Sequence, residues 1–202
     1  MDSTKKLIVA SGNAGKMREI RAICSDLNIT IDSLEDAFGE KIDIPETGTT
    51  FLENATLKAN WVRERKECWV LADDSGLMVD ALNGEPGVYS ARYAGESCND
   101  KDNIVKLLNA LKDVDAENRG AKFVSQMVLL GPNGESVDVV GECHGTISQE
   151  KSGNNGFGYD PIFIPEGYSQ SFATLDEESK NKISHRGEAL KKLRGKLDVI
   201  FS

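Results

Sequence analysis

The sequence has few of the residues that build metal clusters and disulfide frameworks. Its 202 residues include two histidines and four cysteines, namely His144, His185, Cys24, Cys68, Cys98 and Cys143. The cysteines are widely spaced, and no two of them form a Cys-x-x-Cys pair. We therefore do not expect a structural zinc site or a fold held together by disulfides.

Long apolar runs and basic clusters are missing as well. After Met1 to Lys6, the first apolar run covers only Leu7 to Ala10, which is too short for a signal peptide or a membrane span. We expect a cytoplasmic protein with no membrane partner. The 33 acidic residues outnumber the 24 basic ones, giving a net charge of -9, so no nucleic-acid partner is expected. An anionic ligand must then be bound by individual cations or by a metal ion.

The first part of the chain predicts a strand, a helix and a second strand. Leu7 to Ala10 has the composition of a buried strand, and the apolar residues from Ile20 to Leu27 have the spacing of one helix face. Ile29 to Ser33 predicts another strand, whereas the polar residues 35–41 predict a loop. The chain length is that of one domain, and we expect residues 1–202 to form it.

A helix start is predicted at Thr50. Thr50 and Glu53 have the spacing of a capping box, which occupies the Glu53 carboxylate. Glu46, just before the helix, is left to point into a cleft. Lys58 falls on the polar face of the same helix, where a lysine is ordinarily solvated.

The rest of the chain adds helices and a hairpin. Asp100 to Leu111 predicts an amphipathic helix. Phe123 to Leu130 and Ser136 to Ile147 flank a Gly-Pro-Asn-Gly turn and predict an antiparallel hairpin. A final helix follows residue 187. A hairpin combined with strand–helix units means that the sheet is mixed.

Asp73 and Asp74 form an unusual pair. They follow the apolar run Cys68 to Ala72 and precede Ser75 and Gly76, where we predict that the strand breaks into a turn. Adjacent carboxylates repel each other, so a bound cation or a raised pKa would accommodate them. The alternative is a turn whose carboxylates only accept backbone hydrogen bonds. This stretch by itself leaves both interpretations open.

The loop between the first strand and helix is a candidate phosphate-binding segment. It consists of Ser11, Gly12, Asn13, Ala14, Gly15 and Lys16. At a helix N-terminus, backbone N–H groups and the helix dipole favour phosphate oxygens. The loop is not a Walker motif, because Ala10 and Met17 stand where that motif has Gly and Ser or Thr. An ordinary strand–helix turn is the alternative.

A second unusual cluster lies near the C-terminus. Gly156 to Pro161 places the ring of Phe157 between two glycines, where a planar ligand can lie against it. Lys180, His185 and Arg186 supply donors that could read the edge of a base. The alternatives are a buried aromatic residue in a turn and a charged helix start.

Taken together, these segments resemble the inosine triphosphate pyrophosphatase family. The matching stretches occur in family order across nearly the whole chain: Ser11–Lys16, Glu46–Ala55, Ala72–Leu77, Pro86–Arg92, Gly156–Pro161 and Ile183–Gly187. The resemblance implies an α/β fold in which an elongated mixed β-sheet is flanked by helices, related to the Maf fold, and a homodimer. It also implies magnesium-dependent hydrolysis of ITP, dITP and XTP to the monophosphate and pyrophosphate.

The resemblance also implies residue roles. Glu46 and Asp74 would bind Mg2+, and Asp74 would be the catalytic residue that accepts a proton from water. The purine nucleoside triphosphate would be bound by Ser11, Gly12, Asn13, Ala14, Gly15, Lys16, Lys58, Ser75, Phe157, Gly158, Tyr159, Asp160, Lys180, His185 and Arg186.

Two other interpretations deserve a test. A Maf-type pyrophosphatase acting on pyrimidine or methylated nucleotides is disfavoured, because the segments around Phe157 and His185 match the purine family. A catalytically inactive nucleotide-binding protein would be expected to lack the carboxylates of Glu46 and Asp74, and both are present.

Overall fold

The computed structural model describes residues 5–97 and 99–201; residues 1–4 and Cys98, which entered the sequence argument, lie outside this range, as does residue 202. The chain forms two compact units. Unit 1 contains the chain up to Asp74, Ser125–Gly141 and the chain from Ala189, and unit 2 contains Ser75–Val124 and Glu142–Glu188. The single domain expected from the sequence stays a prediction. In the described part of the chain, no helix is long and apolar enough to cross a membrane.

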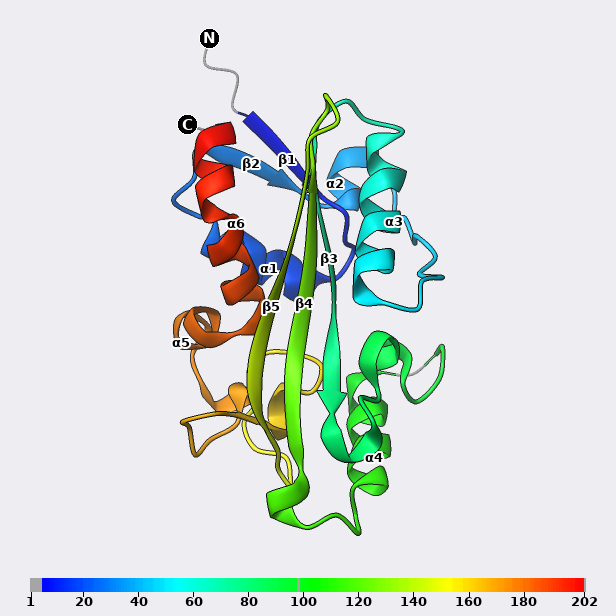
Figure 1. The fold of residues 1–202 in the computed structure, drawn as a ribbon, viewed down its shortest axis with the longest axis vertical. Helices are drawn as coiled ribbons and strands as arrows, with labels where there is room; N and C mark the ends of the chain where they lie inside the picture. The colour runs from blue at the N-terminus through cyan, green and yellow to red at the C-terminus, as the bar shows by residue number, and fades with distance from the viewer. Residues whose placement is uncertain (1–4, 98, 202) are drawn as a thin grey trace. The chain divides into compact units, whose positions relative to one another are not determined.

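The strands form a mixed sheet in the order β2-β1-β3-β4-β5-β6, of which Figure 1 labels β1 to β5. They are β1 Lys5–Val9, β2 Ile29–Asp32, β3 Trp69–Val79, β4 Gly120–Leu130, β5 Ser136–Ile147 and β6 Phe163–Pro165. The α-helices are α1 Ala14–Ile23, α2 Leu34–Phe38, α3 Phe51–Arg63, α4 Asp100–Ala110, α5 Glu177–Ile183 and α6 His185–Phe201. β1 is parallel to β2 and β3, and β5 is antiparallel to β6. The predicted α/β class with a mixed sheet is confirmed.

In unit 1, helices cover both faces of the sheet (Figure 1). On one face, Ile20 of α1 and Leu193 of α6 share a buried cluster with Leu71 of β3. On the other, Val62 of α3 shares a cluster with Val70 of β3. Leu71 and Val70 are neighbours in sequence, and successive side chains of a strand point to opposite faces of its sheet. Each residue of β3 in this unit is therefore committed to one of the two helical layers.

The continuity of β3 corrects the prediction of a turn at Asp73–Ser75. The strand runs without interruption through both aspartates, and both are buried. By alternation, Asp73 lies on the face covered by α1 and Asp74 on the face covered by α3. The prediction failed because paired acids followed by glycine are locally typical of a turn, whereas cations from the neighbouring helices make burial of these charges possible.

A short helix, α2, corrects the prediction of a loop over residues 35–41. Ser33 Oγ accepts a hydrogen bond from the N–H of Asp36, whose carboxylate accepts one from the N–H of Ser33. Gly39, at φ 77°, ends the helix in the left-handed region. Leu34 is its buried anchor. So short a helix has too little apolar periodicity to be recognised from sequence.

The predicted start of α3 at Thr50 is confirmed. Thr50 Oγ1 accepts from the N–H of Glu53 at 3.2 Å, and the Glu53 carboxylate accepts from the N–H groups of Thr49 and Thr50 at 2.7 and 3.1 Å. The Glu53 side chain is thus occupied by the helix start, as the sequence indicated. The cap fixes the first turn of α3 directly after the segment that carries Glu46.

The core of unit 2 is built around α4 and a group of aromatic rings. Ile104 and Leu107 of α4 are buried in it, as the amphipathic pattern predicted. The ring of Phe123 on β4 lies 4.7 Å from that of Phe163 and 6.1 Å from that of Phe172, measured between centroids. Phe163 belongs to β6 and Phe172 follows it in the chain, so these ring contacts anchor β6 and the segment after it in the core of unit 2.

Glu53 gives the stability a dependence on pH. The hydrogen bond from the Thr49 N–H is the largest cause that lowers the pKa of Glu53 from its ordinary value of 4.5. A depressed carboxyl pKa contributes stability that is present above the unfolded-state pKa and lost as the pH falls through the folded-state pKa. Between about pH 5 and pH 3, we expect urea unfolding to show a larger loss of stability for the wild type than for Glu53→Gln.

The matched control is Glu64→Gln at the opposite end of α3, which removes a carboxylate that does not contact the helix start. It should keep the wild-type dependence on pH. If the free energy of unfolding fell equally with pH in the wild type and in Glu53→Gln, the Glu53 carboxylate would not be the source of this pH dependence.

Candidate active site

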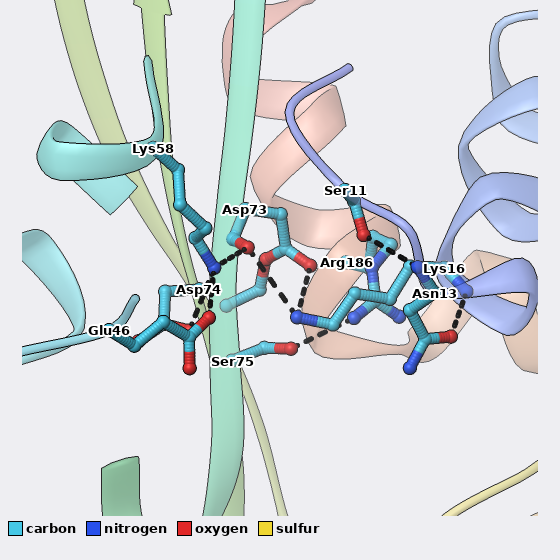
Figure 2. A network of polar contacts seen from close by, with 10 residues as sticks. Ser11, Asn13, Lys16, Glu46, Lys58, Asp73, Asp74, Ser75 and Arg186 are labelled. Atoms are coloured by element: carbon cyan, nitrogen blue, oxygen red, sulfur yellow. Dashed lines mark hydrogen bonds and ion pairs between the residues drawn. The ribbon is translucent and has the colours of Figure 1, made fainter. Parts of the chain in front are cut away.

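Lys58 of α3 ends between two carboxylates (Figure 2). Its Nζ lies 2.7 Å from Glu46 Oε1 and 3.1 Å from Asp74 Oδ1, and it donates a hydrogen bond of 2.9 Å to the backbone carbonyl of Asp73. Only 8% of the Lys58 side chain is exposed. The expectation of a solvated lysine is therefore wrong, because this side of α3 faces β3 and is covered by it.

Burial and charge oppose each other at this contact. Burial is the largest influence on Asp74 and raises its pKa, while the charges of Lys58 and Lys16 lower it; the net pKa is above the ordinary 3.8. For Lys58, burial lowers the pKa, but the carboxylates of Asp74 and Glu46 raise it by more, so the net pKa is above 10.5. The lysine therefore stays an ammonium ion, and two carboxylates share it.

One oxygen of Asp74 lacks a partner. Within the part of the chain that the structure describes, Asp74 Oδ2 is buried and accepts no hydrogen bond. A buried carboxylate oxygen without a donor is costly, and a cation would satisfy it. Together with Glu46, Asp74 offers the hard oxygen ligands that Mg2+ prefers. Among residues 5–97 and 99–201, no group of three His, Cys, Asp or Glu side chains could hold a metal. A site for Mg2+ needs only one or two carboxylates, because this ion keeps water and binds substrate phosphates.

Asp73 meets a different lysine on the opposite side of β3. Lys16 Nζ of α1 lies 3.2 Å from Asp73 Oδ2 and 3.5 Å from its backbone carbonyl (Figure 2). Ser125 of β4 donates a hydrogen bond of 2.7 Å to Asp73 Oδ1. The sequence predicted a cation site or a turn for Asp73 together with Asp74, but not its contact with Lys16, and it gave no indication of Ser125. Asp73 could be noticed in the sequence because it is a charged residue at the end of an apolar run. A serine within the apolar strand β4 does not stand out in this way.

The Ser11–Lys16 loop uses its own side chains to set its shape. Ser11 Oγ accepts from the N–H of Asn13 at 3.1 Å, and Asn13 Oδ1 caps α1 by accepting from the N–H of Lys16 at 3.0 Å. Ala14 and Gly15 open the helix, so their N–H groups have no carbonyl in a preceding turn. The first turn contains no acidic residue. This helix N-terminus is therefore electropositive, as anion binding requires.

Unit 2 brings together another set of predicted residues. Lys180 Nζ lies 4.9 Å from the ring centroid of Phe157, and Arg186 Cζ lies 5.9 Å from it. Lys180 donates to Asp160 Oδ2 at 2.6 Å, and Arg186 donates to Ser75 Oγ at 3.0 Å. An aromatic ring with two cations beside it can take a planar base on its face while N–H donors meet the base edge.

The Phe157 loop is held by two aspartates. Asp160 Oδ2 accepts from the N–H of Phe157 at 2.9 Å, and Asp100 Oδ2 accepts from the N–H of Gly158 at 2.7 Å. A side chain at Gly156, where φ is +75°, would collide with Asp160 Oδ2, so the turn requires glycine. The loop conformation is thus determined by contacts on both sides of the aromatic ring.

Tyr159 and His185 pack into the interior of unit 2. Tyr159 is buried and its hydroxyl donates to the carbonyl of Ser90 at 2.9 Å. The His185 ring stacks on Phe123 with centroids 4.8 Å apart and an interplanar angle of 12°. Phe123 therefore covers one face of the His185 ring, and that face is not available to a ligand.

The contacts of Lys58 predict an unusual response to magnesium. In Lys58→Met, Glu46 and Asp74 lose their cation, so thermal unfolding without metal should show a destabilisation of about 3 kcal/mol. Added Mg2+ should raise the Tm of this variant more than that of the wild type, because the carboxylates are then open to the ion.

Lys122→Met is the control. Lys122 pairs with a single carboxylate, that of Glu142, at 2.8 Å on the surface, so its loss should leave the Mg2+ response unchanged. The same Mg2+-induced shift of Tm in Lys58→Met and in the wild type would refute the idea that Mg2+ binds the two carboxylates that Lys58 neutralises.

The chain is similar to known proteins over nearly its whole length. The model of the Ham1 family matches residues 7–196. The dITP/XTP pyrophosphatase of Oceanobacillus iheyensis is 47% identical over 196 residues, which cover 97% of this chain and 100% of that protein. The dITP/XTP pyrophosphatase of Clostridium perfringens is 48% identical over 203 residues, with coverage of 98% and 99%.

A solved structure agrees with these sequence matches. The Ham1 protein of Staphylococcus aureus is similar with a TM-score of 0.85 and 42% identity, covering 97% of this chain and 100% of that one. The likeness therefore extends over the full length of both proteins.

Proposed function

The chain belongs to the Ham1 family, and we propose that it is a nucleoside triphosphate pyrophosphatase that removes non-canonical purine nucleotides. It hydrolyses ITP, dITP and XTP to the monophosphate and pyrophosphate. The family membership confirms the resemblance that the motifs indicated. The observation that carries the proposal is the convergence of Glu46 and Asp74 on Lys58, with one buried oxygen of Asp74 left without a partner.

Unit 1 is assigned the triphosphate. The helix N-terminus at Ala14 and the ammonium groups of Lys16 and Lys58 neutralise phosphate charge. Glu46 and Asp74 would hold Mg2+, which supplies further charge neutralisation and makes bound water more acidic. Cleavage between the α and β phosphates needs mainly positioning and electrostatic stabilisation of this kind.

Asp74 is assigned the role of proton acceptor. It takes the proton of the attacking water at its carboxylate, and burial helps because it raises the pKa of this group and so makes it a stronger base. Lys58 counters that effect from 3.1 Å and keeps the carboxylate ionised. Burial and the charge of Lys58 together keep Asp74 ionised and make it a stronger base than an exposed aspartate.

Unit 2 is assigned the purine. The face of Phe157 supports the ring, and N–H donors of Lys180 and Arg186 bind the 6-keto oxygen of hypoxanthine or xanthine. Adenine presents an amino group at this position, which would leave donors facing donors. Asp160 and Ser75 hold the two cations in place, at 2.6 and 3.0 Å. ATP should therefore be a poor substrate.

The homodimer and the cytoplasmic location stay predictions that accompany this function. An enzyme that purges the nucleotide pool is expected where nucleic acids are made. Analytical ultracentrifugation of the purified chain tests the dimer directly.

A nucleotide panel tests the reaction. We expect kcat/KM for ITP, dITP and XTP to exceed that for ATP by at least about a hundredfold, because a site built around the 6-keto group leaves its donors unpaired against adenine. Product analysis by 31P NMR should show pyrophosphate and the monophosphate, and chelation of divalent ions should stop the reaction. GTP, UTP and TTP complete the panel, and preference for a pyrimidine would favour a Maf-type activity instead. Comparable values for ATP and ITP would exclude the assigned purine contacts.

A variant of Asp74 tests the mechanism. Asp74→Asn cannot accept the proton, so kcat should fall by about 10^3-fold, within the range for loss of a general base. Binding of ITP, measured by calorimetry, should stay within roughly tenfold of the wild type. Asp138→Asn on the exposed face of β5 is the control and should keep its activity. Unchanged turnover in Asp74→Asn would remove Asp74 from the mechanism.

A further inference from the structure

Asp73 occupies an unusual position between two lysines. It is fully buried, and its backbone carbonyl accepts from Lys58 Nζ at 2.9 Å while its Oδ2 lies 3.2 Å from Lys16 Nζ. One residue thus contacts both ammonium groups that are assigned to the triphosphate. The carbonyl is fixed by the strand β3, but the carboxylate can rotate about its own side-chain bonds unless another contact prevents it.

Ser125 supplies a contact that fixes the carboxylate. It lies on β4, is fully buried, and its hydroxyl donates a hydrogen bond of 2.7 Å to Asp73 Oδ1. A serine hydroxyl has a single proton to donate, and here it is directed at a charged acceptor, which makes a strong hydrogen bond. Because Oδ1 accepts the hydrogen bond of Ser125, Oδ2 points toward Lys16. Figure 2 shows the contact between Asp73 and Lys16.

We propose that Ser125 is a positioning residue for phosphate binding: it orients the Asp73 carboxylate and, through it, the ammonium group of Lys16. This inference rests on the proposed function, in which Lys16 contacts the triphosphate. Lysine carries a flexible stem of four carbons, and holding its ammonium in place before the ligand arrives removes an ordering cost from binding. The serine itself does not touch the substrate.

The probe is inorganic tripolyphosphate, which presents the phosphate chain without a base or sugar. Its binding is measured by isothermal titration calorimetry in the presence of EDTA, so that neither a metal ion nor hydrolysis enters the result. We expect Ser125→Ala to weaken binding by about five- to tenfold, since the lost hydrogen bond is charge-assisted and only part of its effect reaches Lys16. Ser125→Thr, which restores the hydroxyl, should return the affinity to within about twofold of the wild type.

A double-mutant cycle separates positioning from general destabilisation. If Ser125 acts through Lys16, then adding Ser125→Ala to Lys16→Met should cause no further loss of tripolyphosphate affinity. Ser171→Ala is the matched control, because Ser171 is equally buried but its hydroxyl bonds to the uncharged Ser152. It should lower the Tm like Ser125→Ala and bind tripolyphosphate like the wild type.

The outcomes distinguish the inference from the function on which it rests. Wild-type affinity for tripolyphosphate in Ser125→Ala, or equal losses in the presence and absence of Lys16, would overturn the positioning role while leaving ITP hydrolysis by the wild type untouched. Failure of the wild type to hydrolyse any nucleotide of the panel would instead overturn the proposed function, and the calorimetric comparison of Ser125→Ala with the wild type would still report on Lys16.

Discussion

The structure depends on the neutralisation of two adjacent carboxylates that are buried in the middle of a strand. An isolated buried charge is costly enough to prevent folding or to become protonated, so each aspartate needs a cation or strong donors nearby. Lys16 and Ser125 contact the carboxylate of Asp73, and Lys58 contacts Oδ1 of Asp74. The requirement explains why both lysines are drawn toward β3 even though α1 and α3 are far apart in sequence.

Strand geometry turns this requirement into a functional arrangement. Because neighbouring side chains of β3 point to opposite faces, the two aspartates recruit cations from different helical layers. The same alternation appears in the apolar residues Val70 and Leu71, which enter separate clusters. Lys58 contacts both aspartates, since it pairs with the Asp74 carboxylate and also donates a hydrogen bond to the backbone carbonyl of Asp73. Charges of both signs are thereby held close together, as the binding of a metal-bound polyphosphate in the proposed function would require.

Much of the fold could be predicted from the sequence because local rules and tertiary packing agree. The capping box at Thr50 and the apolar periodicity of α4 are local signals, and both elements are found where the sequence places them. Prediction failed where a tertiary contact overrides the local signal. The acidic pair followed by glycine indicated a turn, but lysines from two helices allow β3 to continue. The helix sequence predicts a solvated Lys58, because nothing in it shows which part of the polar face is covered in the folded protein.

The sequence by itself determined the class of the fold and the family, and it predicted a list of candidate site residues, because these depend on composition, spacing and order along the chain. Only the tertiary structure decided how those side chains are paired. The assignment of Lys16 to Asp73 and of Lys58 to Glu46 and Asp74, and the part played by Ser125, depend on the register between β3, β4 and the helices. Contacts between residues dozens of positions apart are set by packing, which leaves no periodic trace in a single sequence.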